Sequence, residues 1–338
     1  MRWQGQTVAG DDGAFPGFAR DALVQTVQTP EFDGITFHEV LCKSALNRIP
    51  AESGLPFGWT INPIRGCSHA CRYCFARSTH EYLELDAGHD FDSQIVVKTN
   101  VAAVLRRELA RRSWRGEPVA LGTNTDPYQR AEGRYRLMPG IIRALTDANT
   151  PFSILTKGSL LRRDLPLLTL AAGRVDVRIG VSLAVFDAEL HAALEPGTPS
   201  PRARLELIRA IVAAGFAVDV MVAPVIPYLT DGRAHLTGLL AAIAEAGATS
   251  VTAFPMHLRG STRGWFLSWL GEHHPALLGK YRKLYGHGAY AAPEYGAWLR
   301  DRLDPMIAEY GLGRPAGRPQ PPPPPPVAPA ESQLELFG

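Results

Sequence analysis

Three of the four cysteines in the chain, Cys67, Cys71 and Cys74, lie within eight consecutive residues. Thiolates at this C-x3-C-x2-C spacing can bind three corners of one [4Fe–4S] cluster. No cysteine follows Cys74, so the run supplies no fourth ligand. A cluster that only carries electrons is usually bound by four cysteines. The spacing therefore predicts a cluster with one iron open to a substrate or cofactor.

A zinc site is the alternative for these cysteines, because Zn²⁺ accepts Cys and His ligands. Cys42 or His69 would complete such a site. Structural zinc sites favour paired C-x2-4-C elements, whereas this chain has one dense group of cysteines. We therefore favour the cluster and expect Cys42 to be a small buried residue.

The residues around the cysteines are similar to those of a known family. The run from Gly66 to Phe75 resembles the signature of the radical S-adenosylmethionine (SAM) enzymes, in which the open iron chelates the amino and carboxylate groups of SAM. The residues before it, from Trp59, and Ala76-Arg77 after it resemble the spore photoproduct lyase-related branch, which is DNA-repair-photolyase-like. The resemblance spans residues 38–260.

Length and composition indicate one large catalytic domain with appendages, since the chain has 338 residues and is 46% hydrophobic. A net charge of +2 argues neither for nor against a nucleic-acid partner. Residues 1–14 lack the apolar core of a secretion signal, and no run approaches the length of a membrane span. We expect a cytoplasmic protein without a membrane partner, because an open cluster needs a reducing compartment.

Short apolar runs alternate with amphipathic helical runs from Trp59 onward, which is typical of βαβ units and a parallel sheet. The expected strands are residues 59–62, 119–123, 152–156, 177–183, 217–222 and 251–254. The expected helices between them are residues 100–114, 138–148, 160–171, 201–214 and 233–246. Six repeats predict an α/β fold, a partial (β/α)6 TIM-type barrel.

Composition divides the chain into four segments. Residues 1–57 are rich in Gly, Pro and Asp and predict an irregular N-terminal arm, followed by the radical SAM barrel at residues 58–258. Residues 259–313 are rich in aromatic side chains and predict a small helical C-terminal cap. Residues 314–338 include six consecutive prolines and predict a disordered Pro-rich linker with a terminal peptide motif.

Polar residues stand at the ends of the expected strands, where the chemistry of a barrel gathers. The resemblance implies that Asn124 or Asp126 accepts a hydrogen bond from the SAM ammonium group. It also implies that Lys157 and Ser182 contact the SAM carboxylate and ribose, for which a cation and a hydroxyl are suited. Tyr73 is expected to pack near the adenine. The alternatives are that Asp126 is only a turn residue, that Lys157 and Ser182 are solvated residues at the barrel rim, and that Tyr73 is an ordinary core aromatic.

Two departures from the family pattern concern hydrogen transfer. The branch has an enzyme that quenches its product radical with a cysteine near the end of the second strand, whereas no cysteine follows Cys74 here. Many relatives carry Tyr where Phe75 stands, so a phenolic hydroxyl is missing. The candidate hydrogen donors are Cys42, Tyr128 and Tyr135.

Local charge favours an anionic partner. Residues 98–136 hold nine Lys or Arg against four acidic residues. Arg107 and Arg111 would share a helix face and could follow a phosphate backbone, although a solvated helix face is the alternative. Arg202 and Arg204, at the start of the helix after the fourth strand, are expected to pair with a carboxylate or phosphate, or to face solvent.

The C-terminal sequence Gln333-Leu334-Glu335-Leu336-Phe337 resembles the peptide by which bacterial replication and repair proteins bind the DNA polymerase sliding clamp. Gln333 would hydrogen-bond to a pocket rim, while Leu334, Leu336 and Phe337 would supply apolar area. The Pro-rich spacer would present this peptide on an extended tether. The alternatives are a segment that packs back on the barrel and a chance match.

The sequence therefore predicts a radical SAM enzyme that uses a [4Fe–4S] cluster to cleave SAM reductively to a 5′-deoxyadenosyl radical. The resemblance implies action on a DNA lesion or modified base, as in the photoproduct lyases. It also implies an electron donor such as flavodoxin or ferredoxin. The alternatives are modification of RNA or protein, and a structural or redox-sensing iron–sulfur protein that does not cleave SAM.

Overall fold

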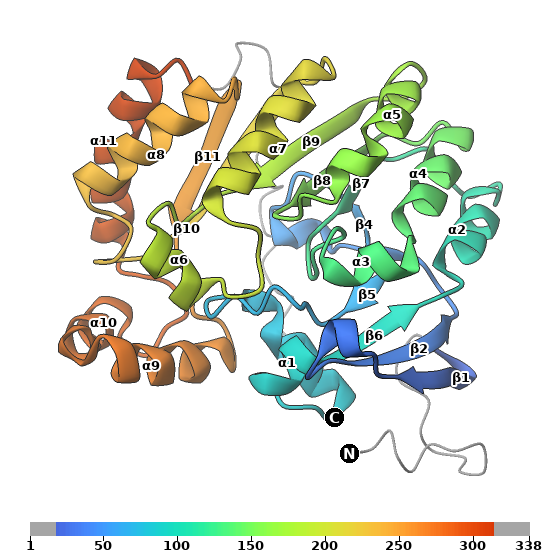
Figure 1. Ribbon diagram of the computed structural model, residues 1–338, viewed down its shortest axis with the longest axis horizontal. Coiled ribbons are helices and arrows are strands. Elements are labelled where there is room, and N and C mark those ends of the chain that lie inside the picture. The colour runs from blue at the N-terminus through green and yellow to red at the C-terminus, as the bar shows by residue number, and fades with distance from the viewer. Residues whose placement is uncertain (1–17, 314–338) are drawn as a thin grey trace, which may run out of the picture.

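The computed structural model describes residues 18–313, and its main feature is a seven-stranded sheet of order β11-β10-β9-β8-β7-β4-β3 (Figure 1). Six of these strands run parallel, namely β4 (Trp59–Ile61), β7 (Val119–Leu121), β8 (Phe152–Thr156), β9 (Val177–Ser182), β10 (Val218–Val225) and β11 (Ser250–Pro255). β3 (Leu46–Arg48) pairs antiparallel with β4 at one edge. The partial barrel predicted from the sequence is confirmed.

The burial of side chains explains why these runs are strands. In β8, Phe152, Ile154 and Thr156 are buried while Ser153 and Leu155 are half-buried, which is the period of two expected when one face meets the core. Long helices lie in an arc outside the sheet, and these are α2 (Val101–Leu109), α4 (Met138–Asp147), α5 (Leu161–Ala172), α7 (Pro201–Ala213), α8 (Arg233–Glu245) and α11 (Pro293–Glu309) (Figure 1).

Shorter helices connect these elements. They are η2 (Pro30–Phe32), η3 (Ala51–Ser53), η4 (Phe75–Leu83), α1 (His89–Ser93), α3 (Arg130–Tyr135) and α6 (Ala188–Leu194). Within residues 18–313, no helix has both the length and the apolar character needed to cross a membrane.

The N-terminal segment is more regular than the sequence indicated. We expected an irregular arm, whereas residues 18–48 contain β1 (Phe18–Val27), β2 (Thr36–Cys42) and β3. β1 and β2 form a second sheet of order β1-β2-β6-β5 with β6 (Gln94–Lys98) and β5 (Ile64–Arg65). Thr36 and His38 are polar but buried in β2, so the sequence does not alternate clearly there.

The C-terminal segment also differs from the single cap that we expected. α9 (Thr262–His273), η5 (Pro275–Leu277) and α10 (Leu278–Tyr285) form a cap, and α9 contacts η4. In contrast, α11 contacts α8 and β11. Its residues Leu299, Leu303 and Met306 are part of the main core, because this i, i+4, i+7 spacing places them on one helix face. α11 is therefore the barrel helix that follows β11.

Candidate functional site

The three clustered cysteines lie in the loop of residues 66–74 between β5 and η4, which we name the cysteine loop. Cys67 and Cys71 are each 7% exposed and belong to two separate apolar groups. Cys74 is half-buried and packs against both groups. Burial is the main factor that raises the pKa of all three thiols. The loop therefore gathers three thiols around one region of the barrel.

The arrangement of these thiols bears on the zinc alternative. In the described part of the chain, no three His, Cys, Asp or Glu side chains are placed to hold one metal ion. A zinc site needs every ligand within bonding distance of one ion, whereas a [4Fe–4S] cluster takes each cysteine at a different iron. Cys42 lies in the main core, apart from the groups of the other cysteines. Cys42 is therefore not grouped with the other three cysteines.

Gln129 fixes the first half of the cysteine loop. Its Oε1 accepts a hydrogen bond from the backbone N–H of Ser68 at 2.8 Å, and its Nε2 donates to the carbonyl of Gly66 at 3.0 Å. The hydroxyl of Thr125 donates to the same carbonyl at 2.7 Å. Gly66 has a φ of +82°, and a Cβ there would lie 2.9 Å from the carbonyl oxygen of Phe91. Sequence reasoning missed Gln129, because a lone glutamine in the loop before α3 (Arg130–Tyr135) carries no recognisable signal.

Arg77 fixes the second half of the loop. Its Nε donates to the carbonyl of Cys71 at 3.0 Å, and Nη1 donates to the carbonyl of Gly88 at 2.7 Å. Nη2 contacts both carboxylate oxygens of Asp92 at 2.8 and 2.9 Å. The guanidinium also lies 4.9 Å from the ring centroid of Trp265 on α9. This fully buried cation therefore joins the cysteine loop to α1 and to the cap.

A buried ion pair lies beside the last cysteines. The hydroxyl of Tyr73 donates to Oε1 of Glu195, and Nη2 of Arg204 forms an ion pair with Oε2 of the same carboxylate. Nη1 of Arg204 donates to the carbonyl of Ser182 at 3.1 Å. Burial alone would raise the pKa of Glu195, but Arg204 and Lys157 lower it to about 2. Arg204 thus pairs with a carboxylate, as one of our alternatives stated, and that carboxylate belongs to the protein.

Asp126 has a different role from the one that the resemblance implied. It accepts hydrogen bonds from the Thr156 hydroxyl and from the backbone N–H groups of Lys157 and Tyr128, at 2.7 and 2.8 Å for the latter two. Nδ1 of His69 lies 3.3 Å from its Oδ2. Burial would raise the pKa of Asp126, but His69 and these donors lower it to about 2. Four donors use the capacity of both oxygens. Asp126 therefore fixes the loops after β7 and β8 and leaves no open acceptor for a ligand.

Two of the expected cofactor contacts are open. The ammonium group of Lys157 lies 5.8 Å from the ring centroid of Tyr73 and has no hydrogen bond or ion pair with any residue in 18–313. The Asn124 side chain is exposed and likewise has no hydrogen-bond partner among these residues. Ser182 is buried at the end of β9. Lys157 and Asn124 can therefore receive a ligand beside the cysteines.

The structure directs the three candidate hydrogen donors to other partners. The hydroxyl of Tyr128 donates to Oδ2 of Asp164 on α5 at 3.1 Å. The hydroxyl of Tyr135 donates to Oε1 of Glu39 in the smaller sheet at 2.9 Å. Cys42 lies at the end of β2 in the main core. None of these three groups is brought to the cysteine loop, so our expectation for the hydrogen donor is not supported.

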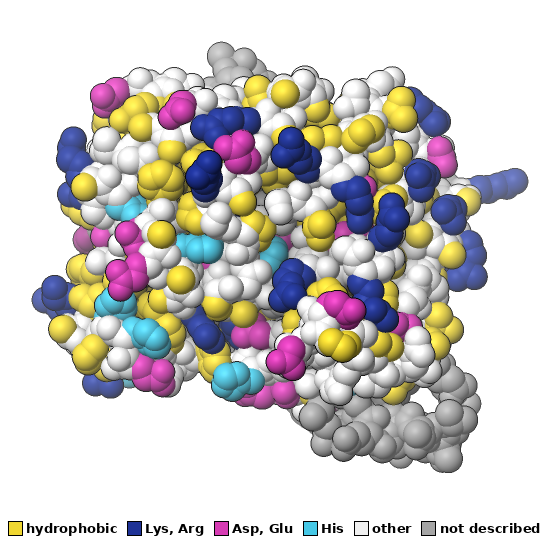
Figure 2. Space-filling model, in the orientation of Figure 1, with side chains coloured by type: hydrophobic (Ala, Val, Ile, Leu, Met, Phe, Trp, Pro, Cys, Tyr) yellow, Lys and Arg dark blue, Asp and Glu magenta, His cyan; other side chains and the backbone are white. Residues whose placement is uncertain are grey.

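The expected nucleic-acid contacts also lie elsewhere. α2 ends at Leu109, so Arg107 and Arg111 do not share a continuous helix face. The backbone N–H of Trp114 donates to the carbonyl of Arg111, and Trp114 packs 5.4 Å from Trp59, the first residue of β4. This places Arg111 near the amino ends of the barrel strands, opposite the cysteine loop. Figure 2 shows several basic side chains over the outer helices α2, α4 and α5, and others spread across the rest of this face.

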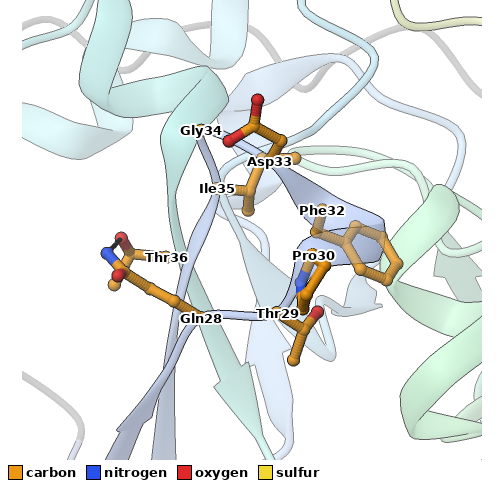
Figure 3. Close-up of a pocket in the computed structure, with 8 residues that line it drawn as sticks. All are labelled: Gln28, Thr29, Pro30, Phe32, Asp33, Gly34, Ile35 and Thr36. Atoms are coloured by element: carbon orange, nitrogen blue, oxygen red, sulfur yellow. Dashed lines mark hydrogen bonds between the residues drawn. The ribbon is translucent and has the colours of Figure 1, made fainter.

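A surface pocket is separate from this site. Its lining residues come from η2, from the loops on either side of η2 and from the start of β2, and they are Gln28, Thr29, Pro30, Phe32, Asp33, Gly34, Ile35 and Thr36 (Figure 3). Phe32 in its wall packs against Phe37 at 5.0 Å and against the guanidinium of Arg130 at 5.0 Å. None of the lining residues belongs to the cysteine loop or to the strand ends that surround it. The pocket is therefore not part of the candidate site.

Comparison with known proteins identifies the family. The model of the Radical SAM superfamily matches residues 61–240, which include the cysteine loop, Lys157 and the Glu195–Arg204 pair. The chain belongs to the radical SAM superfamily. Uncharacterized proteins of Mycobacterium tuberculosis and Mycobacterium bovis are 63% identical to this radical SAM protein over 99% of its length and 98% of theirs. An uncharacterized protein of Methanocaldococcus jannaschii is 25% identical over 51% of this chain and 62% of its own.

Solved structures of spore photoproduct lyase share the fold. A point mutant of that enzyme matches with a TM-score of 0.60 and 17% identity, covering 82% of this chain and 80% of the lyase. A variant with bound AdoMet and dinucleoside spore photoproduct also gives a TM-score of 0.60, with 16% identity and coverage of 79% and 77%. The family and the fold together make this protein a radical SAM enzyme.

Proposed function

We propose that this radical SAM enzyme binds a [4Fe–4S] cluster through Cys67, Cys71 and Cys74 and acts on a DNA lesion or modified base. The observation that carries the proposal is the gathering of three thiols, two buried and one half-buried, beyond the carboxyl end of β4. They lie beside the ammonium of Lys157, which has no hydrogen-bond partner among residues 18–313. When bound, the cluster and SAM would supply the radical chemistry that the proposed reaction needs.

The residues around the thiols would bind and orient SAM. Lys157 offers a cation for the SAM carboxylate, and the exposed amide of Asn124 offers an acceptor for its ammonium group. The ring of Tyr73 lies 5.8 Å from the Lys157 ammonium, and its hydroxyl donates a hydrogen bond to Glu195. The ligands of a radical enzyme must be held rigidly while water is excluded, and the buried Glu195–Arg204 pair supplies that rigidity.

The likeness to spore photoproduct lyase supports a DNA substrate, because some of those structures hold a dinucleoside spore photoproduct. Modification of RNA or protein is the alternative within the same chemistry. A cluster protein that does not cleave SAM is a third possibility, but Lys157 and Asn124 favour a ligand beside the thiols. No cysteine follows Cys74, so we do not extend the proposal to repair of the spore photoproduct itself.

The substrate is tested with DNA that carries a mixture of ultraviolet and oxidative lesions. The anaerobically reconstituted enzyme is incubated with this DNA, SAM and a reductant, and the digested nucleosides are compared by mass spectrometry. We expect a product that requires SAM and is absent with the Cys71→Ala variant. SAM turnover without any SAM-dependent DNA product would contradict the DNA substrate and favour RNA or protein.

Two partners remain proposals. Gln333, Leu334, Leu336 and Phe337 lie outside the described residues, and we propose that this peptide binds the bacterial DNA polymerase sliding clamp. Support comes from the sequence pattern and from the Pro-rich segment before it. Reductive cleavage of SAM also requires an electron donor, for which we propose a flavodoxin or ferredoxin.

A further inference from the structure

Exposed aromatic side chains gather where β11 ends. Phe254 is 38% exposed and Tyr290 is 52% exposed. The ring of His257 lies between them, stacked on Phe254 at 5.6 Å and edge-on to Tyr290 at 4.6 Å. The guanidinium of Arg259 lies 5.1 Å from the Tyr290 ring centroid and donates to its hydroxyl. We name these four residues the β11 aromatic surface.

Hydrogen bonds to backbone carbonyls hold the two loops that form this surface. The N–H of Leu258 donates to the carbonyl of Ala289 at 2.7 Å, which joins the loop after β11 to the loop after α10. The guanidinium of Arg263 donates to the carbonyls of Gly286 and Gly288 at 2.5 and 2.7 Å. The exposed rings are therefore presented on fixed backbone.

The surface borders the cysteine loop. Thr262, three residues after Arg259, donates from its hydroxyl to the carbonyl of Cys74 at 3.0 Å. A Cβ on Gly260 would lie 3.5 Å from the Cβ of Ser78 on η4. The segment from Arg259 to Thr262 thus runs directly from the exposed rings to the last cysteine of the site.

The chemistry of the surface matches an unpaired nucleobase. Aromatic rings stack on any base, an arginine adds a cation–π contact, and its charge suits a phosphate. None of the four residues is acidic. A base inside a duplex has both faces covered, so an enzyme that reacts with one must take it out of the stack or bind it already unpaired. A surface beside the cysteines would hold such a base or its unpaired neighbour.

We propose that the β11 aromatic surface is a base-stacking subsite that holds an unpaired base of the nucleic-acid substrate next to the cysteine loop. This inference rests on the proposed DNA function and names the state in which the DNA is bound. It predicts that DNA with an unpaired base binds more tightly than an intact duplex of the same length and charge.

The test uses the full-length, cluster-reconstituted enzyme and a DNA duplex that carries 2-aminopurine as a single-base bulge. Stacking on an aromatic ring quenches the fluorescence of 2-aminopurine. We expect quenching by the wild type, and binding about tenfold weaker with reduced quenching for Phe254→Leu and for Tyr290→Leu, because the loss of one stacking contact weakens binding by about this order of magnitude. Tyr290→Phe keeps the ring and should bind like the wild type.

A matched control is Trp298→Ala. Trp298 is 40% exposed and has the guanidinium of Arg302 at 4.3 Å from its ring, but it lies on the outer helix α11. This variant should bind and quench as the wild type does. Iron content per chain and the midpoint of thermal unfolding verify that each variant is folded.

Two results would overturn the inference, and only the second would also contradict the proposed DNA function. If the wild type binds the bulged DNA while Phe254→Leu and Tyr290→Leu bind and quench equally well, the subsite is wrong but DNA binding stands. If the wild type binds neither bulged nor intact DNA, the proposed DNA function falls together with the subsite.

Discussion

The hydroxyl of Tyr73 donates a hydrogen bond to the carboxylate of Glu195, which follows it by 122 residues. Glu195 also pairs with Arg204, and Glu195 and Arg204 have no exposed area. The contact therefore ties the cysteine loop to the segment between α6 and α7 inside the protein. A buried charge that loses its partner is strongly unfavourable. The contacts among Tyr73, Glu195 and Arg204 must therefore all be present in the folded protein.

Replacing Arg204 by Met should lower the free energy of unfolding by about 3–5 kcal/mol, because Glu195 would remain as an unpaired buried charge. Chemical denaturation of the protein measures this loss. Arg209→Met on the same helix is the control, since Arg209 is 40% exposed and pairs with Glu206 at 3.0 Å on the surface. That change should cost less than about 1 kcal/mol. Equal losses for both variants would contradict the account.

Asp126 should make the fold sensitive to acid. Its pKa of about 2 lies below the ordinary value of 3.8, so the folded state binds fewer protons than the unfolded state between these values. The stability that Asp126 provides is present above about pH 4 and is lost as the pH falls toward about 2. Asp126→Asn should remove about 2 kcal/mol at neutral pH and flatten the dependence in this window.

Urea denaturation of iron-free protein at several acidic pH values measures this effect. Glu195 also has a pKa lowered to about 2, so part of the pH dependence should persist in Asp126→Asn. An unchanged pH profile in the variant would show that Asp126 does not carry the hydrogen bonds described above.

Lys157→Met should weaken the binding of SAM to the reconstituted enzyme about 10- to 100-fold, because a hydrogen bond to a charged group contributes roughly 1.5–3 kcal/mol. Equilibrium dialysis with labelled SAM measures this without turnover. Lys280→Met is the matched control, since Lys280 is an exposed residue of α10 in the cap and lies 5.3 Å from the ring of Tyr228. Wild-type affinity in Lys157→Met would remove Lys157 from the cofactor site.

The C-terminal peptide should bind a bacterial sliding clamp. A labelled peptide of residues 328–338 is titrated with purified clamp, and saturable binding with a Kd of about micromolar order is expected for a short motif. Combining Leu336→Ala with Phe337→Ala should abolish binding, because both apolar contacts are lost. Absence of binding by the wild-type peptide and by the full-length protein would remove the clamp from the account.

Local sequence patterns predicted the barrel well. Each of the six parallel strands forms a short apolar run, and β8 has the predicted bounds of residues 152–156. The cysteine spacing and the position of Lys157 after β8 could also be read locally. The strands of the smaller sheet could not, because buried polar residues such as His38 interrupt their alternation.

The roles of several site residues could not be predicted from the sequence, because these residues contact others that are far away along the chain. Glu195 follows an ordinary helix, and nothing near it in the sequence shows that it meets Tyr73. The family resemblance names Asn124 or Asp126 as the acceptor for the SAM ammonium group, whereas four internal donors occupy the Asp126 carboxylate. The role of Arg111 depended on where α2 ends, and boundaries are the least certain part of a sequence-based prediction.

The central claim is that three cysteines hold a cluster that cleaves SAM. The most direct measurement is chromatography of 5′-deoxyadenosine formed from SAM by anaerobically reconstituted protein with a strong reductant. We predict 5′-deoxyadenosine from the wild type and from Cys42→Ala, and none from Cys67→Ala, Cys71→Ala or Cys74→Ala. Stoichiometric zinc without iron, or an intact cluster that never consumes SAM, would contradict the account.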